Sequence, residues 1–421
     1  MSIGNGEPCH DARVPETASV DRSAGRRYVQ LVLVLGALGT IGPFTIDTYL
    51  PALPELSREL GATDAQAQAT LSGLLLGLGL GQLLIGPLSD AIGRRKPLLA
   101  GLVLHALMSV LCALAPSIQL LIAARFLQGL AGAAVAVISM AMVRDLFTGV
   151  RAAQLFSRLM LVLGVGPIVA PSLGSALLTV MSWRGIFVVL ATAALLMLAL
   201  AFFALPETLP TRRRRRMSVV GSLRTYGMLF SDRLFLVLVL MSGLVFATIF
   251  AYIAGSSFIL QDLYGLSPQQ FGLAFTVNSI GLIAVTQLNP SLVKRHNPVS
   301  VLIAGLLLSA AAAITLLVLM VLEVGGWAVF LAPLFVIISS AGLTLPNAPA
   351  IALTRYGDAA GTAAALLGAS QYVIGGAIAP LVGVLANGTP VPLAGVLVAT
   401  TTLATLLLLP ARRALARVDY R

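Results

Sequence analysis

Long apolar runs separated by short polar turns occupy most of this chain. A membrane-spanning helix needs about 20 consecutive, mostly apolar residues, and the short alternating segments of a transmembrane β-barrel are absent from the sequence. We therefore predict an all-α membrane protein with twelve transmembrane helices. The predicted spans are Tyr28–Leu50, Gln66–Leu88, Pro97–Ala115, Ile118–Met142, Arg158–Val180, Ile186–Leu205, Leu234–Leu260, Phe271–Val293, Val299–Leu322, Trp327–Ala348, Ala359–Ala386 and Leu393–Leu409.

One polar interruption is much longer than the others and divides the runs six plus six. We predict a disordered cytoplasmic tail over residues 1–27, a six-helix half over 28–205, a basic cytoplasmic linker over 206–233, a second six-helix half over 234–409 and a cytoplasmic tail over 410–421. Two weak internal sequence repeats favour pseudo-symmetric, duplicated halves. Gly61, Thr63 and Gln66 reappear as Gly265, Ser267 and Gln270, and Gly166, Ala170, Pro171 and Gly174 reappear as Gly375, Ala379, Pro380 and Gly383.

The composition agrees with this architecture and excludes other classes. Of 421 residues, 58% are hydrophobic and only 10% are charged, with a mean hydropathy of +0.96. Soluble domains carry about 45–50% apolar and about 25% charged residues. A soluble enzyme, a disordered chain and a nucleic-acid-binding domain are therefore excluded.

The net charge of +11 is explained by topology. With the N-terminus inside, every basic residue but Arg58, Arg184 and Arg125 falls in an inner loop or tail, as the positive-inside rule requires. Both termini are then cytoplasmic. The run Arg212–Arg216 is predicted to hold this loop in the cytoplasm by its positive charge. A binding site for anionic lipids is the alternative.

Two charged residues lie inside predicted spans. Asp47 is near the outer end of the first span, and Arg125 is seven residues into the fourth, which runs the opposite way. A charge at membrane depth costs several kcal/mol, so each is a functional candidate. The two residues would share one depth and one site. Separate structural roles, with Asp47 capping a helix and Arg125 reaching outward, are the alternative.

Proton carriage is the chemistry that this pair suggests. A carboxyl group in an apolar medium favours its neutral form, and a nearby guanidinium favours the ionised form. A contact between Asp47 and Arg125 that forms and breaks would load and unload a proton as a cavity opens to alternate sides.

The turn between the second and third spans combines a helix break, an acid and three cations. It reads Gly86-Pro87-Leu88-Ser89-Asp90-Ala91-Ile92-Gly93-Arg94-Arg95-Lys96. Asp90 can pair with Arg94 or Arg95, so we predict a conformational latch that includes Gly86, Asp90, Gly93, Arg94 and Arg95.

These residues carry a family resemblance. The string from Gly86 to Lys96 resembles the signature loop of the major facilitator superfamily, and Arg125-Phe126-Leu127-Gln128-Gly129 resembles its fourth-helix motif. Gly164, Gly166, Pro167, Pro171 and Gly174 resemble the fifth-helix motif of drug/proton antiporters. Asp47-Thr48-Tyr49-Leu50-Pro51-Ala52-Leu53-Pro54 and Leu205-Pro206-Glu207-Thr208-Leu209 are similar to the Bcr/CflA drug-resistance subfamily.

The resemblance implies a proton-coupled multidrug exporter of the bacterial inner membrane, with Arg125 in proton coupling. Three departures qualify it. Ser175 follows Gly174 where a glycine pair is usual, and the second-half copy of the signature loop, around Pro290 to Arg295, is degenerate. Gly39 stands where some related exporters carry a second acid, which weakens the case for coupling to several protons and for cationic drugs.

Several aromatic and amide residues lie in spans expected to face a central cavity, where they suit flexible, weakly polar drugs. Ordinary helix packing is the alternative for each one, and for His105 an interior structural role is favoured over a relay. The candidates are Phe44, Tyr49, Gln128, Phe246, Phe250, Tyr252, Asn278, Asn347, Gln371 and Tyr372.

We therefore expect an exporter of small lipophilic drugs, phenicol- or bicyclomycin-like, working by alternating access. The alternative is an exporter or facilitator of a sugar or amino acid. We expect no enzymatic activity, no metal, no cofactor besides the proton as coupling ion, and no nucleic acid. Membrane lipids are the expected partners, and the protein is expected to be a monomer.

Overall fold

The computed structural model describes residues 22–146, 164–214, 226–355 and 360–416. Eleven helices or helix groups in this part of the chain are long and apolar enough to cross a membrane, and a shorter apolar helix covers Gly164–Leu177. The all-α prediction is confirmed, and twelve crossings are compatible with the described residues. The main helices are α1 (Arg22–Asp47), α3 (Asp64–Ile92), α4 (Arg95–Ala113), α5 (Ile118–Leu146), α7 (Trp183–Ala204), α9 (Arg233–Phe258), α10 (Pro268–Val293), α11 (Pro298–Val321), α12 (Trp327–Thr344), α14 (Ala360–Val384) and α15 (Val391–Ala416).

Two predicted spans are interrupted where the sequence supplies proline. The first helix ends at Asp47 and continues as the 3-10 turn η1 (Leu50–Ala52) and the short helix α2 (Leu53–Glu59), and both begin with a proline in their first turn. The tenth span divides into α12 and α13 (Asn347–Arg355), with Pro346 between them. Proline lacks the backbone N–H that an uninterrupted helix requires, so each break follows from the sequence.

Parts of some predictions lie outside the described residues. These are the tail before residue 22, the start of the fifth span, linker residues 215–225, residue 359 and the last five residues. The boundaries predicted for the two halves stay predictions.

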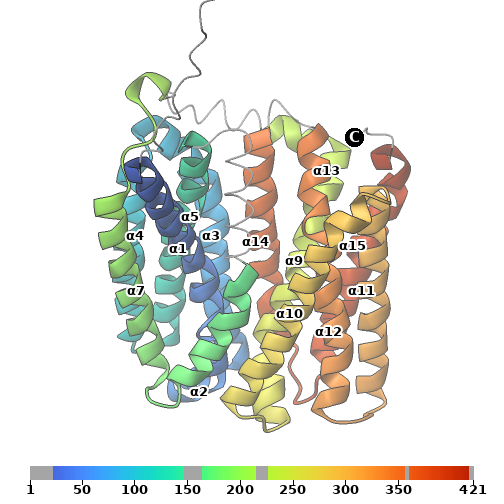
Figure 1. Cartoon of the computed structure of the whole chain (residues 1–421). Helices are drawn as coiled ribbons and strands as arrows, with labels where there is room; N and C mark the ends of the chain where they lie inside the picture. Colours follow the sequence, from blue (N-terminus) through green and yellow to red (C-terminus); the bar gives the residue numbers. More distant parts are fainter. Residues whose placement is uncertain (1–21, 147–163, 215–225, 356–359, 417–421) are drawn as a thin grey trace, which may run out of the picture.

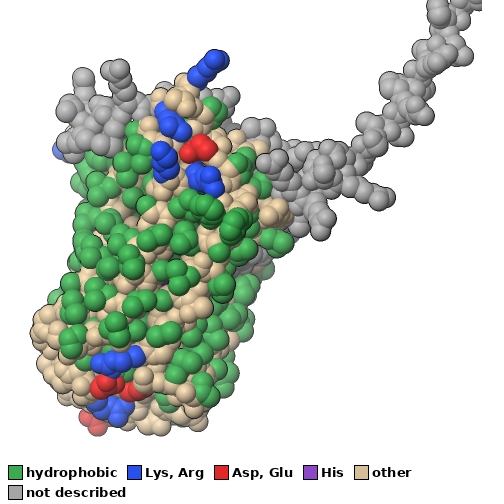
Figure 2. Space-filling view, turned by 90° about the vertical axis from the view of Figure 1, so that its left-hand side faces the viewer, with side chains coloured by type: hydrophobic (Ala, Val, Ile, Leu, Met, Phe, Trp, Pro, Cys, Tyr) green, Lys and Arg blue, Asp and Glu red, His purple; other side chains and the backbone are tan. Residues whose placement is uncertain are grey.

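The helices before residue 205 and those after residue 233 form two groups that stand side by side (Figure 1). In the first group α5 packs on α3 and α4, and in the second α9 packs on α14 and α15. Helices α3 and α14 meet where the groups join. Figure 2 shows hydrophobic side chains over the middle of one face and charged side chains at its two ends, as expected of a protein in a bilayer.

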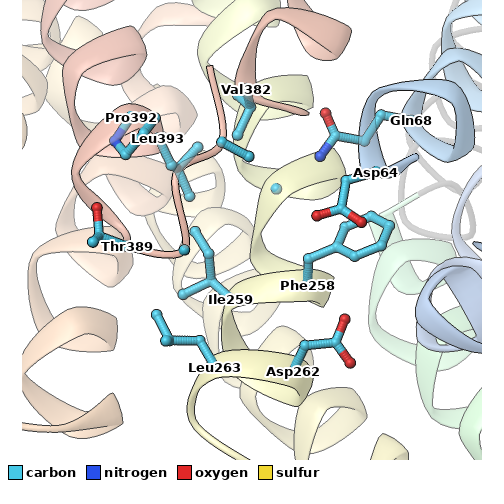
Figure 3. Close-up of a pocket in the computed structure, with 13 residues that line it drawn as sticks. Asp64, Gln68, Phe258, Ile259, Asp262, Leu263, Val382, Thr389, Pro392 and Leu393 are labelled. Atoms are coloured by element: carbon cyan, nitrogen blue, oxygen red, sulfur yellow. The ribbon is translucent and has the colours of Figure 1, made fainter. Parts of the chain in front are cut away.

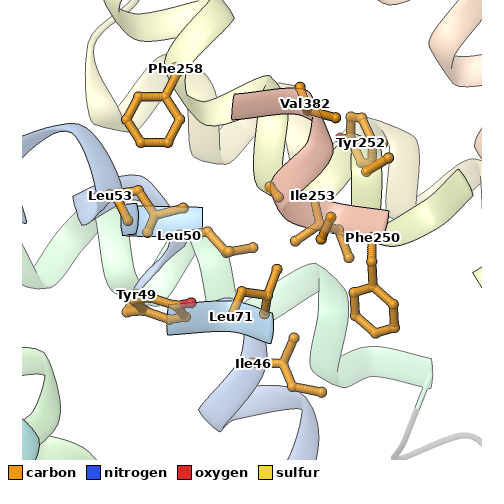
Figure 4. Packing of buried hydrophobic residues seen from close by; sticks show 14 of the residues in the cluster. Ile46, Tyr49, Leu50, Leu53, Leu71, Phe250, Tyr252, Ile253, Phe258 and Val382 are labelled. Atoms are coloured by element: carbon orange, nitrogen blue, oxygen red, sulfur yellow. The ribbon is translucent and has the colours of Figure 1, made fainter. Parts of the chain in front are cut away.

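The largest apolar core crosses the boundary between the groups. It combines Ile46, Tyr49 and Leu53 from the first group with Phe250 and Phe258 from the second, and all five are buried (Figure 4). The two groups therefore share one core near η1 and α2.

Polar contacts close the same end of the molecule, which we call the α2 end. The Ser257 hydroxyl donates to the Leu50 carbonyl oxygen at 2.7 Å, and the Gln261 amide donates to the Pro51 carbonyl oxygen at 3.1 Å. Ser175 donates to the carbonyl oxygen of Pro268 at 2.8 Å. Because these bonds join the first group to the second, the α2 end is closed in this conformation.

Glycines allow α3 and α5 to pack with their backbones in contact. A Cβ atom built on Gly129 would overlap the Leu74 carbonyl oxygen, and one built on Gly77 would overlap that of Phe126. Small residues permit this close approach in membrane helices. The contact fixes Arg125, about one turn before Gly129, and Gln128, the residue just before it, relative to α3.

We predict that Gly129→Ala destabilises the protein, because the added methyl group must push the two helices apart. Overpacking of this kind costs about 1–3 kcal/mol. In detergent, the melting temperature should fall by several degrees. Gly132→Ala on the same helix is the matched control, since its Cβ would meet only Leu78 at an ordinary 3.5 Å. Equal melting temperatures for the two variants would contradict the prediction.

Candidate functional site

Asp47 is a buried acid without a hydrogen-bond partner for its Oδ1 atom among the described residues. It is the last residue of α1, and its side chain is 4% exposed. It stands just before the break at η1, where the first group meets the second. A buried polar atom without a partner is costly and invites a functional explanation.

Arg125 is completely buried, and its two Nη atoms are hydrogen-bonded whereas its Nε atom has no partner among the described residues. Its Nη1 and Nη2 atoms both donate to the Thr45 carbonyl oxygen at 3.1 Å, and Nη1 also donates to the Gln128 Oε1 atom at 2.7 Å. The guanidinium lies 4.1 Å from the centre of the Tyr49 ring and 5.6 Å from that of Phe187. Carbonyl dipoles and aromatic faces therefore stabilise its charge.

Asp47 and Arg125 form no ion pair within the part of the chain that the structure describes. The connection between them is indirect, because the carbonyl that Arg125 holds belongs to Thr45, two residues before Asp47 on α1. The site thus separates a fixed cation from a carboxyl group that is free to gain or lose a partner. Whether they exchange a proton stays a prediction.

Asp47 also faces the second group of helices. Its neighbour Ile46 belongs to the same buried core as Phe250 and Tyr252 of the second group, and Tyr372 packs against that core. The Tyr252 ring stacks on Phe275 with centroids 5.5 Å apart, and its hydroxyl accepts a hydrogen bond from the Asn278 amide at 2.8 Å. Two predicted cavity residues, Tyr252 and Asn278, are thus brought together near Asp47.

Three more candidates form an aromatic cluster in the second group. Phe246, Phe250 and Tyr372 have ring centroids 5.8, 5.9 and 6.3 Å apart. Phe250 is buried, whereas Phe246 and Tyr372 are half-buried. The cluster offers an apolar surface close to the carboxyl group.

The remaining candidates are dispersed. Gln371 donates to the Ser242 hydroxyl at 2.6 Å, and Asn347 donates to the Asn289 Oδ1 atom at 2.8 Å. Phe44 lines a cavity of about 200 Å³ within the first group of helices. Asn289 and Phe275 complete pairs that sequence reasoning missed, since nothing in their spacing relates them to their partners.

The predicted antiporter motif packs directly on α1. A Cβ atom on Gly166 would meet Pro43, and one on Gly174 would overlap the Thr48 carbonyl oxygen. Pro171 is buried, whereas Gly164 and Pro167 are half-buried. The motif therefore contacts the first helix on both sides of Asp47.

The predicted latch is an ion-pair network at the end of the molecule opposite α2. Arg94 pairs with Asp90 at 2.6 Å and with Asp145 of α5 at 3.1 Å, and it donates to the Ser89 hydroxyl at 2.6 Å. Gly93 ends α3 at a φ of 102°, which explains the glycine there. Asp145 was missed because it lies 51 residues from Arg94 in sequence.

Two further latch residues differ in their contacts. Arg95 donates to the Phe202 carbonyl oxygen at 2.7 Å. A Cβ atom built on Gly86 would meet no other atom within 4 Å.

Glu207 links the segment after α7 to the predicted latch by hydrogen bonds. Its carboxylate accepts hydrogen bonds from the backbone N–H groups of Arg94 at 2.8 Å, Leu209 at 3.0 Å and Arg95 at 3.3 Å, and it faces Arg214 at 3.8 Å. Burial raises the pKa of Glu207, but these N–H groups and Arg214 outweigh it, so the net pKa is lowered. The sequence contained this glutamate in Leu205–Leu209 but did not indicate what it binds.

A second pocket opens at the α2 end, between the two groups. Asp64 and Gln68 come from α3, and Asp262 comes from the π-helical turn η3 (Ile259–Leu263) that follows α9 (Figure 3). The Gln68 Oε1 atom accepts from the backbone N–H of Gly383 at 2.9 Å. No cluster of three or more His, Cys, Asp or Glu suited to a metal ion occurs among the described residues.

A bundle of apolar helices with a buried acid, a buried arginine and a shared interface between two groups defines a multi-pass membrane transporter. Residues 35–380 match the profile of the Major Facilitator Superfamily. The chain belongs to the major facilitator superfamily, and the resemblance stated from its motifs is confirmed.

Curated relatives cover nearly the whole chain. The uncharacterized MFS-type transporter YdgK of Bacillus subtilis (strain 168) is 37% identical over 387 residues, 91% of this chain and 95% of the relative. A bicyclomycin resistance protein homolog of Haemophilus influenzae is 30% identical, covering 86% and 91%. The multidrug resistance protein MdtL of Escherichia fergusonii is 27% identical, covering 89% and 93%.

Solved structures agree on the fold. A D-xylose-proton symporter superposes with a TM-score of 0.70 at 17% identity, covering 91% of this chain and 97% of that one. A bacterial homolog of the human lysosomal transporter Spinster gives 0.73 at 16% identity, covering 96% and 100%.

We predict that Glu207→Gln destabilises the protein in a pH-dependent way. A carboxylate with a lowered pKa in the folded state stabilises that state above the ordinary pKa, near 4.5, and loses this contribution as the pH falls through its folded pKa. The difference in melting temperature between wild type and variant should be largest above pH 5 and shrink on acidification below about 4.5. Exposed Glu323→Gln is the control. A difference that stays constant from neutral to acidic pH would contradict the assignment.

Proposed function

We propose that this protein is a proton-coupled multidrug exporter of the Bcr/CflA type. It would act in the bacterial inner membrane with both termini in the cytoplasm. The observation that carries the proposal is Asp47, a buried acid at the end of α1 whose Oδ1 atom has no hydrogen-bond partner among the described residues. Relatives named for bicyclomycin and multidrug resistance support the substrate class.

In the proposed cycle Asp47 is the proton carrier. When the cavity opens outward, water reaches Asp47 and delivers a proton, which removes the cost of a buried charge. When the cavity opens inward, the proton leaves and drug takes the vacated apolar surface. The Arg125 guanidinium acts as a fixed positive charge that favours release of the proton.

The contacts at the α2 end support assigning this conformation to one step of the proposed cycle. The positive-inside rule assigns the α2 end to the outside. Because bonds from Ser257, Gln261 and Ser175 close that end, the conformation corresponds to an outward-closed step. Reopening the outer side must break these contacts.

The driving force is adequate for export. One proton falling through 100 mV provides about 2.3 kcal/mol, and each pH unit adds about 1.4 kcal/mol. A combined force near 4 kcal/mol sustains roughly a thousandfold drug gradient per proton.

The Phe246–Phe250–Tyr372 cluster supports lipophilic drugs as substrates. Aromatic faces bind flexible apolar molecules without strict orientation, and the nearby amides of Asn278 and Gln371 add a few polar contacts. A sugar or amino acid would need a denser set of hydrogen-bonding groups, so the metabolite exporter remains the alternative outcome of the tests.

Asp47→Asn tests the proposal directly. Inverted membrane vesicles energised with a proton gradient should take up a phenicol or a bicyclomycin-like compound in the wild type. The variant should lose at least nine-tenths of this uptake, because an amide cannot release a proton, while exchange of labelled for unlabelled drug persists. Glu323→Gln is the control for loss of an exposed carboxylate. Full proton-driven uptake by Asp47→Asn would refute the assigned role, and uptake of sugars or amino acids alone would favour the metabolite exporter.

Arg125→Lys tests the guanidinium separately from its charge. Lysine keeps the positive charge but cannot bond the Thr45 carbonyl and the Gln128 amide through one planar fork. We expect proton-driven uptake to fall about tenfold, the effect of one lost charged hydrogen bond. Arg233→Lys at an exposed position is the matched control. Unchanged coupling in Arg125→Lys would mean that charge alone is sufficient.

A further inference from the structure

His105 belongs to a closed polar ring around Arg125. The ring leads from Arg125 to Gln128 at 2.7 Å, from the Gln128 amide to the Ser109 hydroxyl at 2.7 Å, and from that hydroxyl to the backbone carbonyl oxygen of His105 at 2.7 Å. The His105 Nε2 atom lies 3.0 Å from the Thr45 hydroxyl, and the Thr45 carbonyl oxygen binds Arg125 again. Helices α1, α4 and α5 are thereby joined in the membrane interior.

The protons in this ring can be assigned one by one. The Thr45 hydroxyl donates its single proton to the Ile41 carbonyl oxygen at 2.6 Å, so it must accept from His105 Nε2. Ser109 donates to the His105 carbonyl oxygen at 2.7 Å and accepts from Gln128. No proton remains on Ser109 for the His105 Nδ1 atom, which lies 3.5 Å away. The hydrogen bonds of this network therefore require a proton on His105 Nε2 and no proton on Nδ1.

We propose that His105 is a positioning residue: its Nε2–H group holds Thr45, and through Thr45 the carbonyl oxygen that binds Arg125. This inference rests on the proposed proton-coupled transport and adds a residue to it. The position requires a hydrogen-bond donor and does not require a group that relays protons. The sequence offered His105 as a lone histidine in an apolar span, which gave no hint of this ring.

The position tolerates a test by substitution. His105, Thr45 and Phe44 line the cavity of about 200 Å³ within the first group, so a flexible side chain has room to adjust. Glutamine keeps an N–H donor at comparable reach but cannot carry a proton as imidazole does. Leucine removes the donor and leaves the Thr45 oxygen without it.

The experiment compares His105→Gln, His105→Leu and, as a matched control, His296→Leu at an exposed histidine. Proton-driven drug uptake and proton-independent drug exchange are measured in the same inverted vesicles over a range of pH. We expect His105→Leu to reduce proton-driven uptake about tenfold with exchange retained, the cost of one buried donor. His105→Gln should restore uptake with the pH profile of the wild type.

Two results would overturn the proposal. Unchanged uptake in His105→Leu would show that the ring does not need this residue. Loss of uptake in both variants, or a shifted pH profile in His105→Gln, would indicate that the imidazole itself carries a proton.

A thermal double-mutant cycle separates failure of this inference from failure of the proposed function. Melting temperatures of His105→Leu, Gln128→Leu and the double variant are measured in detergent without any drug. Because both residues complete one ring, the second substitution should cost clearly less than it does alone. Additive losses would overturn the ring, whereas non-additive losses in a protein that moves none of the tested drugs would count against drug export only.

Discussion

The burial of Arg125 is the constraint on which the rest of the site depends. A guanidinium remains protonated at any physiological pH, so in a bilayer it can be stabilised only by dipoles, anions or aromatic faces. Here it has no carboxylate partner within the described residues, and the Thr45 carbonyl, the Gln128 amide and the rings of Tyr49 and Phe187 take that role. Each of these groups must be held in place, and this requirement extends from the site into the packing of three helices.

The packing provides that support through small residues and helix breaks. Gly129 brings α5 into backbone contact with α3, and Gly174 brings the fifth span into backbone contact with the Thr48 carbonyl just after Asp47. Pro51 ends the regular helix just after Asp47 and leaves backbone carbonyls free to accept bonds from the second group. Close packing makes such an interior rigid.

The sequence predicted the helices well because a bilayer imposes a simple rule on length and polarity. It also predicted an internal repeat from Gly61, Thr63 and Gln66, and the structure shows why: both copies form a capping box, with a glycine at positive φ just before it. Charged residues in spans stood out for the same reason. Partners such as Asp145 for Arg94, or Ser109 for Gln128, were not predictable, because nothing in one sequence shows which residues on different helices come into contact. The predicted ends of the first and tenth spans, Leu50 and Ala348, lie three and four residues past the ends of α1 and α12, beside the prolines.

The two halves share a fold but not a chemistry. The six apolar runs predicted between Leu234 and Leu409 contain no acidic or basic residue, and the first half places Arg125 and Asp47 in its interior. The second half presents the Phe246–Phe250–Tyr372 cluster and the Tyr252–Asn278 pair instead. In the proposed cycle one half therefore responds to the proton and the other binds the drug, and Asp47, at the end of α1, lies next to the core that the two halves share. A charge on Asp47 has to be hydrated or shielded whenever the halves close around it, whereas a neutral carboxyl does not. Protonation thereby acts on the closure of the shared core itself, so coupling between proton and drug requires no direct contact between them.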